Sequence, residues 1–200
     1  SNVYDGFIGR YSGSTGVATV TGENSQWNNS GYLYVGDYGT GTLNIMDGGV
    51  VSNTHGSIGY DSTSTGEATV TGANSQWNNS DRLTVGYSGT GTLNVEAGGV
   101  VSNDWGSIGR ESGSTGAATV TGTGSQWHNT NLSVGSAGSG TLNVASSGVV
   151  SNGNGYIGHY AASTGQVTVT NSGSQWNNSG GLWVGLYGSG TLDVTDGGMV

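Results

Sequence analysis

The 200-residue sequence has no cysteine, no proline and no lysine, and it has only three arginines against twelve acidic residues. The absence of cysteine excludes a disulfide framework and a thiolate zinc site, and it suits a chain that crosses a membrane unfolded. The formal charge of −9 leaves no basic patch that could neutralise a phosphate backbone, so we expect neither nucleic acid nor anionic membranes as partners. No apolar run reaches the ~20 residues of a membrane-spanning helix, so we expect no membrane insertion.

The sequence is rich in glycine, at 42 positions, and it places Val, Ile, Leu, Thr, Trp and Tyr at regular intervals. So much glycine without proline is unlike an ordinary close-packed globule. Disordered chains are usually charged and poor in β-branched and aromatic residues, whereas only 8% of this chain is charged. The composition therefore favours β-strands joined by tight turns.

The sequence repeats itself closely along its whole length. The tryptophan of the Ser-Gln-Trp segment lies at Trp27, Trp77, Trp127 and Trp176, in steps of 50, 50 and 49 residues. Each period contains two similar halves, such as "STGVATVTGENSQWNN" (14–29) and "GTGTLNIMDGGVVSN" (39–53). A period of this size is typical of a solenoid, so we expect residues 1–200 to form a single β-solenoid segment of a longer array of 50-residue double-coil repeats.

An asparagine marks the same place in every half, five or six residues before an Ile-Gly or Val-Gly pair. The column consists of Asn2, Asn29, Asn53, Asn79, Asn103, Asn129, Asn152 and Asn178. It divides the chain into about eight coils of 23–27 residues. We expect these asparagines to adopt left-handed turn conformations and to stack their amides in a hydrogen-bonded ladder.

Each coil contains three short segments with strand character, separated by turn residues; in the third coil they are 57–60, 66–72 and 75–79. In the middle segment apolar residues such as Leu93 and Val95 alternate with Thr or Asn, which predicts one face in the core and one in solvent. No 3.6-residue spacing indicates a helix. The predicted fold class is therefore all-β, a right-handed parallel β-helix (β-solenoid) with three short strands per coil and a length of roughly 38 Å.

A glycine and a tryptophan also recur at fixed places in the repeat, and both have structural interpretations. A glycine follows the first strand of every coil, where the chain turns, and we expect it to adopt a positive φ. The tryptophan column is either buried at the third strand or exposed as a platform for sugars. The short coils carry a valine at the equivalent place, which favours burial.

Two recurring motifs resemble those of a known family. "GTGTLNIMDGGVV", "GTGTLNVEAGGVV", "GSGTLNVASSGVV" and "GSGTLDVTDGGMV" follow one pattern, and "NSQWNN", "GSQWHN" and "GSQWNN" follow a second. They are similar to the repeats of autotransporter (type V secretion) passenger domains, over nearly the whole chain. The resemblance implies a segment of a large bacterial protein that is exported across both membranes and is extracellular or displayed on the outer surface. It implies no activity, because passengers that share this scaffold differ in function.

No constellation in the sequence predicts catalysis, a cofactor or a metal site. The acids that stand at corresponding turns lie at least two coils, or ~10 Å, apart, which is too far to share a proton or a calcium ion. These acids are Asp47, Glu96 and Asp196. Arg10 and Arg110 occupy equivalent positions two periods apart, and His55 and Trp105 occupy a variable turn. We therefore expect a chain that is not an enzyme and that holds no cofactor or metal.

Aromatic residues gather around the first strand and the loop after it, and they are candidates for contact with a partner. This edge consists of Tyr11, Tyr32, Tyr34, Tyr60, Tyr87, Trp105, Tyr160, Trp183 and Tyr187. Amphipathic rings along one edge of a rod could bind glycan or protein, although ordinary surface decoration accounts for them equally well.

Two functions are compatible with this scaffold. The first is a non-enzymatic structural or stalk segment of a secreted or surface-displayed autotransporter-like protein. The alternative is an adhesin or a self-assembling extracellular filament subunit, which binds glycans, cells or copies of itself through the aromatic edge. The sequence shows no polar cap at either end, so we expect either caps outside it or stacking of coils between copies, end to end or laterally.

Overall fold

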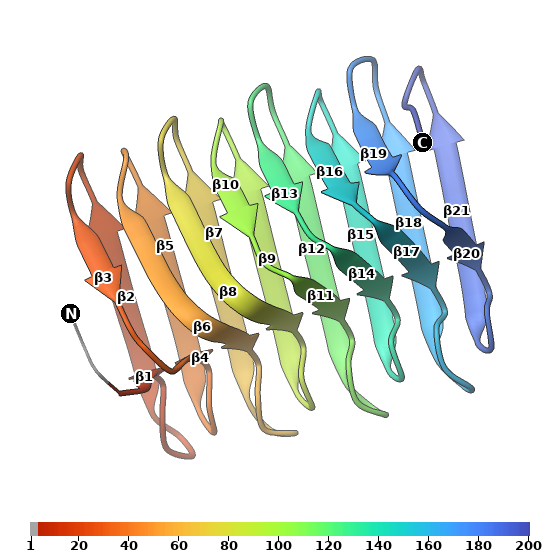
Figure 1. Cartoon of the computed structure of the whole chain (residues 1–200). Coiled ribbons are helices and arrows are strands. Elements are labelled where there is room, and N and C mark those ends of the chain that lie inside the picture. The colour runs from red at the N-terminus through yellow and green to blue at the C-terminus, as the bar shows by residue number, and fades with distance from the viewer. Residues whose placement is uncertain (1–3) are drawn as a thin grey trace.

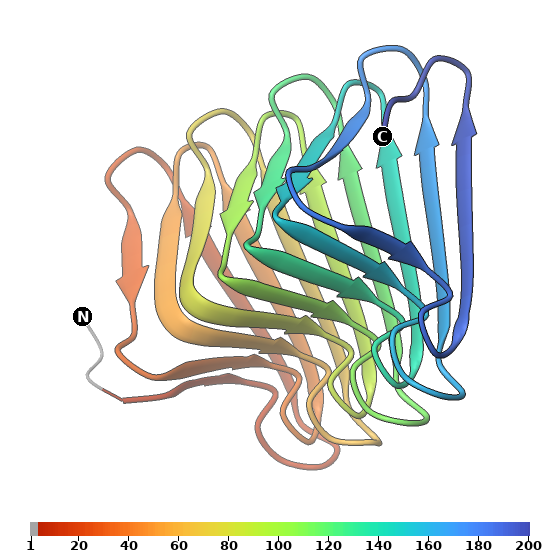
Figure 2. The same ribbon diagram turned by 45° about the vertical axis from the view of Figure 1, so that its right-hand side comes forward.

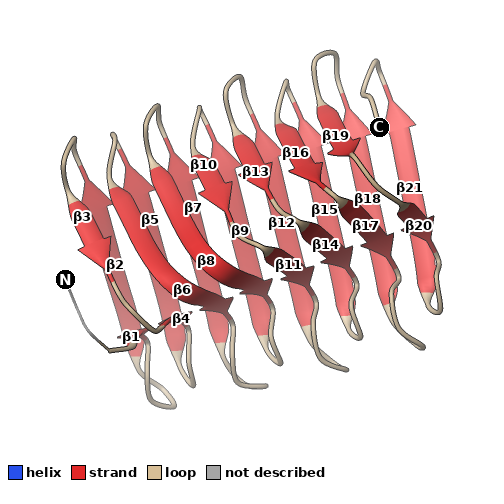
Figure 3. Cartoon of the chain, viewed as in Figure 1, coloured by secondary structure: helices blue, strands red, loops and turns tan. Residues whose placement is uncertain are grey.

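The computed structural model describes residues 4–200, which form an all-β solenoid of about eight coils; Asn2, the first of the asparagine column, lies outside them. In Figure 1 the near strands run downward and the far strands upward as the chain advances from left to right, so the coil is right-handed. Strands in successive coils pair in parallel. No helix occurs in this part of the chain (Figure 3), and hence none that is long and apolar enough to cross a membrane.

The middle strand of every coil belongs to an eight-stranded parallel sheet, which we call the long face. Its strands are β2 (Thr15–Thr21), β5 (Thr40–Met46), β7 (Thr65–Thr71), β9 (Thr90–Glu96), β12 (Thr115–Thr121), β15 (Ser139–Ala145), β18 (Thr164–Thr170) and β21 (Ser189–Thr195). Equivalent residues stand opposite each other, as Leu43 opposite Ala68 and Ile45 opposite Val70. This register gathers the apolar residues of all coils on the inner side of the sheet.

The other two strands of each coil form a 13-stranded sheet that bends around one corner of the solenoid (Figure 2). One part, the tryptophan face, contains β3 (Gln26–Asn28), the beginnings of β6 (Val50–Ile58) and β8 (Gln76–Val85), β10 (Val100–Ser102), β13 (Gln126–His128), β16 (Val149–Asn152) and β19 (Gln175–Asn178). The other part, the aromatic face, contains β1 (Gly6–Ile8), β4 (Tyr32–Val35), the ends of β6 and β8, β11 (Trp105–Ile108), β14 (Asn131–Val134), β17 (Asn154–Ile157) and β20 (Leu182–Val184).

The three predicted faces are confirmed, with one correction. β6 and β8 run through the corner between the tryptophan and aromatic faces, where the sequence predicts separate strands. The pairing between them shifts register after Asn53, so the extra residue of β8 is absorbed without ending either strand.

The corner between the aromatic and long faces requires a left-handed residue. Gly59 follows β6 with a φ of 69°, and a Cβ atom there would collide with the backbone carbonyl of Thr90 in the next coil. Glycine alone adopts a positive φ without strain and has no Cβ atom to collide with this carbonyl. The equivalent glycines also have positive φ, namely Gly9, Gly36, Gly86, Gly109, Gly135, Gly158 and Gly185. The prediction of a left-handed glycine in every coil is therefore confirmed.

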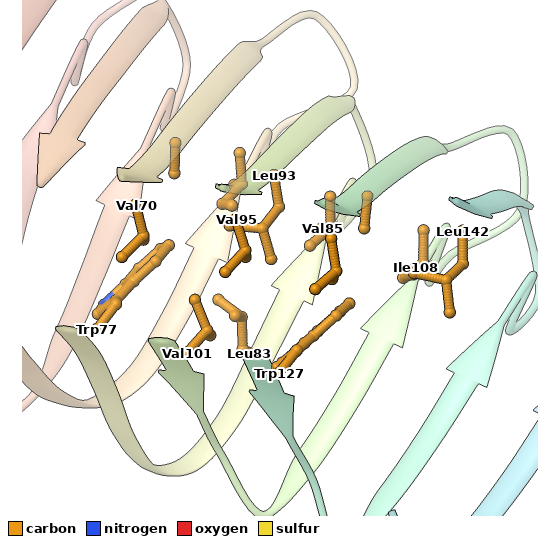
Figure 4. Close-up of a cluster of buried hydrophobic side chains, with 14 of the residues drawn as sticks. Val70, Trp77, Leu83, Val85, Leu93, Val95, Val101, Ile108, Trp127 and Leu142 are labelled. Carbon is orange, nitrogen blue, oxygen red and sulfur yellow. The ribbon is translucent and has the colours of Figure 1, made fainter. Parts of the chain in front are cut away.

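A continuous apolar core runs along the solenoid. Leu93 and Val95 point inward from the long face, and Val101, Leu83 and Val85 meet them from the other two faces (Figure 4). All five side chains are fully buried, as the alternation in the sequence predicts. The corresponding residues of the first and last coils are less buried, because described residues cover them on one side only. These less buried residues are Ala18, Val20, Leu192 and Val194.

Packing explains why the sequence repeats over two coils and not over one. Trp77 is fully buried, and Val51 and Val101 stand opposite it in the coils before and after. Gly56 lies where the next coil has Leu83, and a Cβ atom on it would stand only 3.0 Å from the indole of Trp77. Coils with a tryptophan and a glycine thus alternate with coils that have a valine and a leucine at the same two places. This alternation keeps the core volume similar from coil to coil.

The buried tryptophans are anchored by the asparagine column. Trp127 Nε1 donates to Asn103 Oδ1 over 2.7 Å, and Asn103 Nδ2 donates to Asn129 Oδ1 over 2.7 Å. The same two bonds join Trp77 with Asn53 and Asn79, and Trp176 with Asn152 and Asn178. Trp77, Trp127 and Trp176 are 0% exposed, so the predicted burial is confirmed for them, and Trp27 is partly buried.

The predicted conformation of the asparagine column is wrong, although its predicted amide bonding is confirmed between paired coils. None of the described asparagines in the column has a positive φ. Asn53 and Asn79 lie inside β6 and β8, where extended backbone directs their amides toward the indole and toward each other. Hydrogen bonding to the tryptophan, and not turn formation, therefore explains asparagine at this place.

Candidate ligand-binding groove

The outward side chains of the aromatic face form two columns along the solenoid axis. One contains Phe7, Tyr34, Ser57, Thr84, Ser107, Ser133, Tyr156 and Trp183. The other contains Tyr32, His55, Arg82, Trp105, Asn131 and Asn154. His55 and Trp105 both pair with Arg82 of β8, so their prediction as turn residues is wrong. Successive members of a column lie ~4.8 Å apart along the axis, so their side chains can contact one another.

Aromatic rings crowd the N-terminal part of this face. Tyr32 stacks on Tyr34 and on His55, with ring centroids 5.4 and 4.3 Å apart. Tyr60 meets Tyr34 edge-on at 5.0 Å and contacts Tyr87 at 4.8 Å. These five residues come from three successive coils, so the rings form a connected strip along the axis.

A second group of rings occupies the C-terminal part. Tyr156 stacks on His159 at 4.2 Å and on Trp183 at 4.8 Å. His159 stacks in turn on Tyr160 at 4.1 Å, and Trp105 lies parallel to Tyr156 at 6.5 Å. The interplanar angles of all four pairs are 11° or less, so these rings form a stack of nearly parallel planes.

Between the two groups the outward column carries small hydroxyl residues, and the surface sinks into two hollows. The N-terminal hollow, of about 190 Å³, is lined by Tyr32, Tyr34, His55, Gly56, Ser57, Tyr60, Arg82, Thr84, Tyr87 and Arg110. The central hollow, of about 420 Å³, is lined by Arg82, Trp105, Ser107, Arg110, Glu111, Ser136, Ala137 and Tyr160. Arg82 and Arg110 line both hollows, so the two form one feature, which we call the groove.

All three arginines of the sequence lie on or beside the aromatic face. Arg10 stacks its guanidinium over Phe7 at 4.1 Å, and Arg110 lies over Tyr87 at 4.7 Å. Arg82 lies in β8, in the middle of the second outward column. The sequence places Arg10 and Arg110 too far apart to act together, whereas the fold brings Arg82 and Arg110 to the same groove.

The groove contains polar atoms that lack hydrogen-bond partners. Among the described residues, five buried side-chain nitrogen or oxygen atoms have no partner, and Ser57 Oγ, Arg82 Nε and Ser107 Oγ are three of them. Ser57 and Ser107 are only 4% and 2% exposed. A buried polar atom without a partner costs about 1–3 kcal/mol, so native proteins carry few of them. Their concentration in one groove marks it as a place where a polar ligand would gain hydrogen bonds.

Burial favours the uncharged form of Tyr34, Tyr60 and His159 on this face. Burial, together with the neighbouring Tyr60 and Asp5, raises the pKa of Tyr34 well above its usual range. Burial also raises the pKa of Tyr60 and lowers that of His159. The tyrosines therefore offer neutral hydroxyl groups, and His159 offers a neutral imidazole stacked between Tyr156 and Tyr160.

The structure brings together most of the predicted contact edge. Tyr32, Tyr34, Tyr60 and Tyr87 line the N-terminal hollow, and Trp105 and Tyr160 line the central hollow. Trp183 belongs to the second group of rings through its stacking on Tyr156. Tyr11 lies beside the Arg10 guanidinium at 5.5 Å, outside the groove. Tyr187 is 72% exposed and lines neither hollow.

Five polar residues on the strands of the groove are missing from the predicted edge: His55, Ser57, Arg82, Thr84 and Ser107. A signal for them exists in the sequence, because each stands one or three residues before the Ile or Val of the Ile-Gly or Val-Gly pair. Alternation along the strand directs both places outward, in the same columns as the aromatic residues.

Two acidic residues near the groove are paired with basic side chains. Asp81 Oδ2 lies 3.6 Å from His55 Nδ1, and Glu111 Oε1 lies 3.4 Å from Arg110 Nε. Within residues 4–200 no group of three or more His, Asp or Glu side chains is placed to hold a metal ion. Comparison of the chain with protein-family models, curated proteins and solved structures finds no match.

Proposed function

We propose that this chain is a rigid, non-enzymatic segment of a secreted or cell-surface protein of the autotransporter kind, and that its aromatic face binds glycans. One observation carries the glycan proposal: two hollows on one face combine aromatic rings with unpartnered polar atoms. Ligand sites are typically concave and largely aromatic or apolar, with a few polar groups that fix the orientation of the ligand.

A sugar suits this combination of groups. Its C–H faces are apolar and pack against rings such as Tyr87 and Trp105, whereas its hydroxyl groups need donors and acceptors at the same time. Ser57 and Ser107 provide hydroxyl groups, which both donate and accept. A purely apolar ligand would leave these atoms unpartnered.

The shape of the site favours an extended chain of sugars over a single small molecule. Tyr34 and Tyr156 stand in the same outward column, five coils apart, which corresponds to ~24 Å along the axis. The ring groups lie at the two ends of this distance and the groove lies between them. An oligosaccharide laid parallel to the axis would contact both.

The non-enzymatic part of the proposal is supported by the state of the acids. Hydrolysis of a glycosidic bond requires two carboxyl groups about 5–10 Å apart, one on each side of the bond. In the groove, Glu111 is engaged with Arg110, and Asp81 beside it is engaged with His55. These two carboxylates are therefore engaged with basic side chains, which suits retention of a glycan.

The test is a glycan array probed with the labelled chain and with single variants. We expect the wild type to bind a defined set of oligosaccharides, and Tyr34→Ala and Tyr87→Ala each to weaken binding about tenfold through loss of ring stacking. Tyr187→Ala is the matched control, because Tyr187 is exposed and lies outside the groove. Circular dichroism confirms that each variant is folded.

Two results would contradict this function. Absence of binding on the array, or equal loss in the Tyr187→Ala control, removes the aromatic face as a glycan site. Light scattering over a concentration series tests the remaining prediction, association of the chain with its own copies. Self-association that disappears with Tyr34→Ala would identify the face as a protein contact instead.

A further inference from the structure

Two of the three arginines of this acidic chain line one groove. The sequence has a formal charge of −9 and three arginines, and two of these, Arg82 and Arg110, line the same groove. Arginine binds carboxylate through a planar fork of N–H groups, which include Nε. A carboxylate of a ligand can therefore pair with an arginine in the groove of a chain whose net charge is negative.

Arg82 is the residue best prepared for such a ligand. Its Nε atom is buried without a hydrogen-bond partner, and it forms no ion pair with a carboxylate of the described residues. The nearest coils place His55 and Trp105 beside it in the outward column, so a group bound to Arg82 would lie between two ring systems. Arg110, by contrast, already contacts Glu111 and Tyr87.

We propose that the groove binds an acidic glycan, with the carboxylate of a sugar acid on Arg82. This inference rests on the proposed glycan-binding function and specifies its ligand class. The sugar ring lies against Tyr87 or Trp105, and its hydroxyl groups bond to Ser57 and Ser107, which lack partners otherwise. Arg110 lines the same groove and is paired with Glu111.

The carboxylate is favoured over a sulfate ester by the number of free donors. Glu111 pairs with Arg110 Nε. Among the described residues, Arg82 is therefore the one groove arginine whose Nε–H group has no hydrogen-bond partner. A planar carboxylate is satisfied by one such fork, whereas a sulfate group presents a third oxygen to the same site. Sulfated sugars are included in the test because they share the negative charge.

The experiment uses matched ligands on the intact chain. The probes are oligomers of galacturonate, glucuronate and mannuronate and a sialylated oligosaccharide, each compared with its methyl ester, together with sulfated oligosaccharides. We expect at least one acid form to bind about tenfold more tightly than its ester, the loss expected for a charge-assisted hydrogen bond. Calorimetry or biolayer interferometry measures both forms.

Variants then assign the charge effect to one residue. Arg82→Gln should weaken binding of the acid about tenfold and leave binding of the ester unchanged, and Arg82→Lys should restore part of the loss. Arg10→Gln is the matched control, because Arg10 lies over Phe7 outside the groove. Tyr87→Ala should weaken acid and ester alike, since stacking does not depend on the charge.

Each outcome has a separate meaning. If glycans bind but no acid exceeds its ester, or if Arg82→Gln has no effect, the acidic-ligand inference is wrong and the glycan-binding function remains. Preference for sulfated over carboxylated sugars also overturns the assignment of a carboxylate to Arg82. If the chain binds no glycan in either form, the proposed function fails and this inference fails with it.

Discussion

The hydrogen bond between Trp127 and Asn103 gives a direct test of how the two-coil repeat is stabilised. Trp127 is fully buried, and its Nε1 donates to Asn103 Oδ1 over 2.7 Å. Trp127→Phe keeps an aromatic ring but removes this donor. The change leaves Asn103 Oδ1 without its partner, at about 1–3 kcal/mol, and the smaller ring costs roughly 1 kcal/mol more. We therefore expect a loss of about 2–4 kcal/mol in the free energy of unfolding.

The partner variant Asn103→Ala tests the same bond from the other side. It removes the acceptor of Trp127 Nε1 and the donor to Asn129 Oδ1, so two buried atoms lose their partners. We expect a loss of about 2–4 kcal/mol here as well. In the double variant the shared bond is lost only once. The loss of unfolding free energy in the double variant should therefore be smaller than the sum of the two single losses by about 1 kcal/mol or more.

The assay is urea unfolding followed by far-ultraviolet circular dichroism, with the slope m compared between variants to verify that the transition is unchanged. Trp27→Phe is the matched control, because Trp27 is only partly buried and its Nε1 bonds to Asn29 of the same coil at 3.1 Å. Its loss should be about 1 kcal/mol or less. Equal losses for Trp27→Phe and Trp127→Phe, or additive losses in the double variant, would refute the reasoning.

Three further predictions concern the core and one titrating group. Val95→Asp puts a carboxylate into the core and should cost more than about 4 kcal/mol, with protease sensitivity over several coils, whereas Asn94→Asp on the solvent side of the same strand should be nearly neutral. Gly155→Ala should cost about 1–3 kcal/mol, because its Cβ would stand 3.0 Å from Trp176; an unchanged melting temperature would contradict this packing. Burial lowers the pKa of His159 below its usual 6.5, so the unfolded chain binds the proton more readily. Stability should be full above pH 6.5 and decline below it, and His159→Gln should flatten this slope in melts from pH 4 to 8.

The sequence predicts the fold well because the core residues themselves repeat. Leu93 and Val95 alternate with polar residues in the same register as Leu43 and Ile45, and parallel stacking is the arrangement that buries all of them. The extent of each strand is less predictable. β8 continues past Asn79, whereas β13 ends at His128 although Asn129 accepts the same kind of amide bond, and no local pattern in the sequence indicates this difference.

The groove is predictable only in part. Its aromatic residues stand out in the sequence because they are large and irregularly placed. Ser57 and Ser107 do not stand out, because their importance comes from the residues around them. Both serines are buried, and tyrosines and arginines from the same and neighbouring coils line the hollows with them. Such a site requires the register between coils, which places His55, Arg82 and Trp105 in one column.

The same register explains how a repetitive scaffold can carry a specific site. Inward positions are constrained from coil to coil, since a Cβ atom on Gly106 would collide with the side chains of Asn129 and Leu132. Outward positions on the aromatic face have no such partner in the core, so Tyr34, Ser57 and Arg82 can differ between coils without altering the packing. The sequence is therefore repetitive where it builds the solenoid and varied on the face that we propose to bind a glycan. An exchange of Tyr34 and Ser57 between their coils should accordingly leave the melting temperature within a few degrees of the wild type while abolishing glycan binding. A large drop in stability would show that the outward column is part of the packing after all.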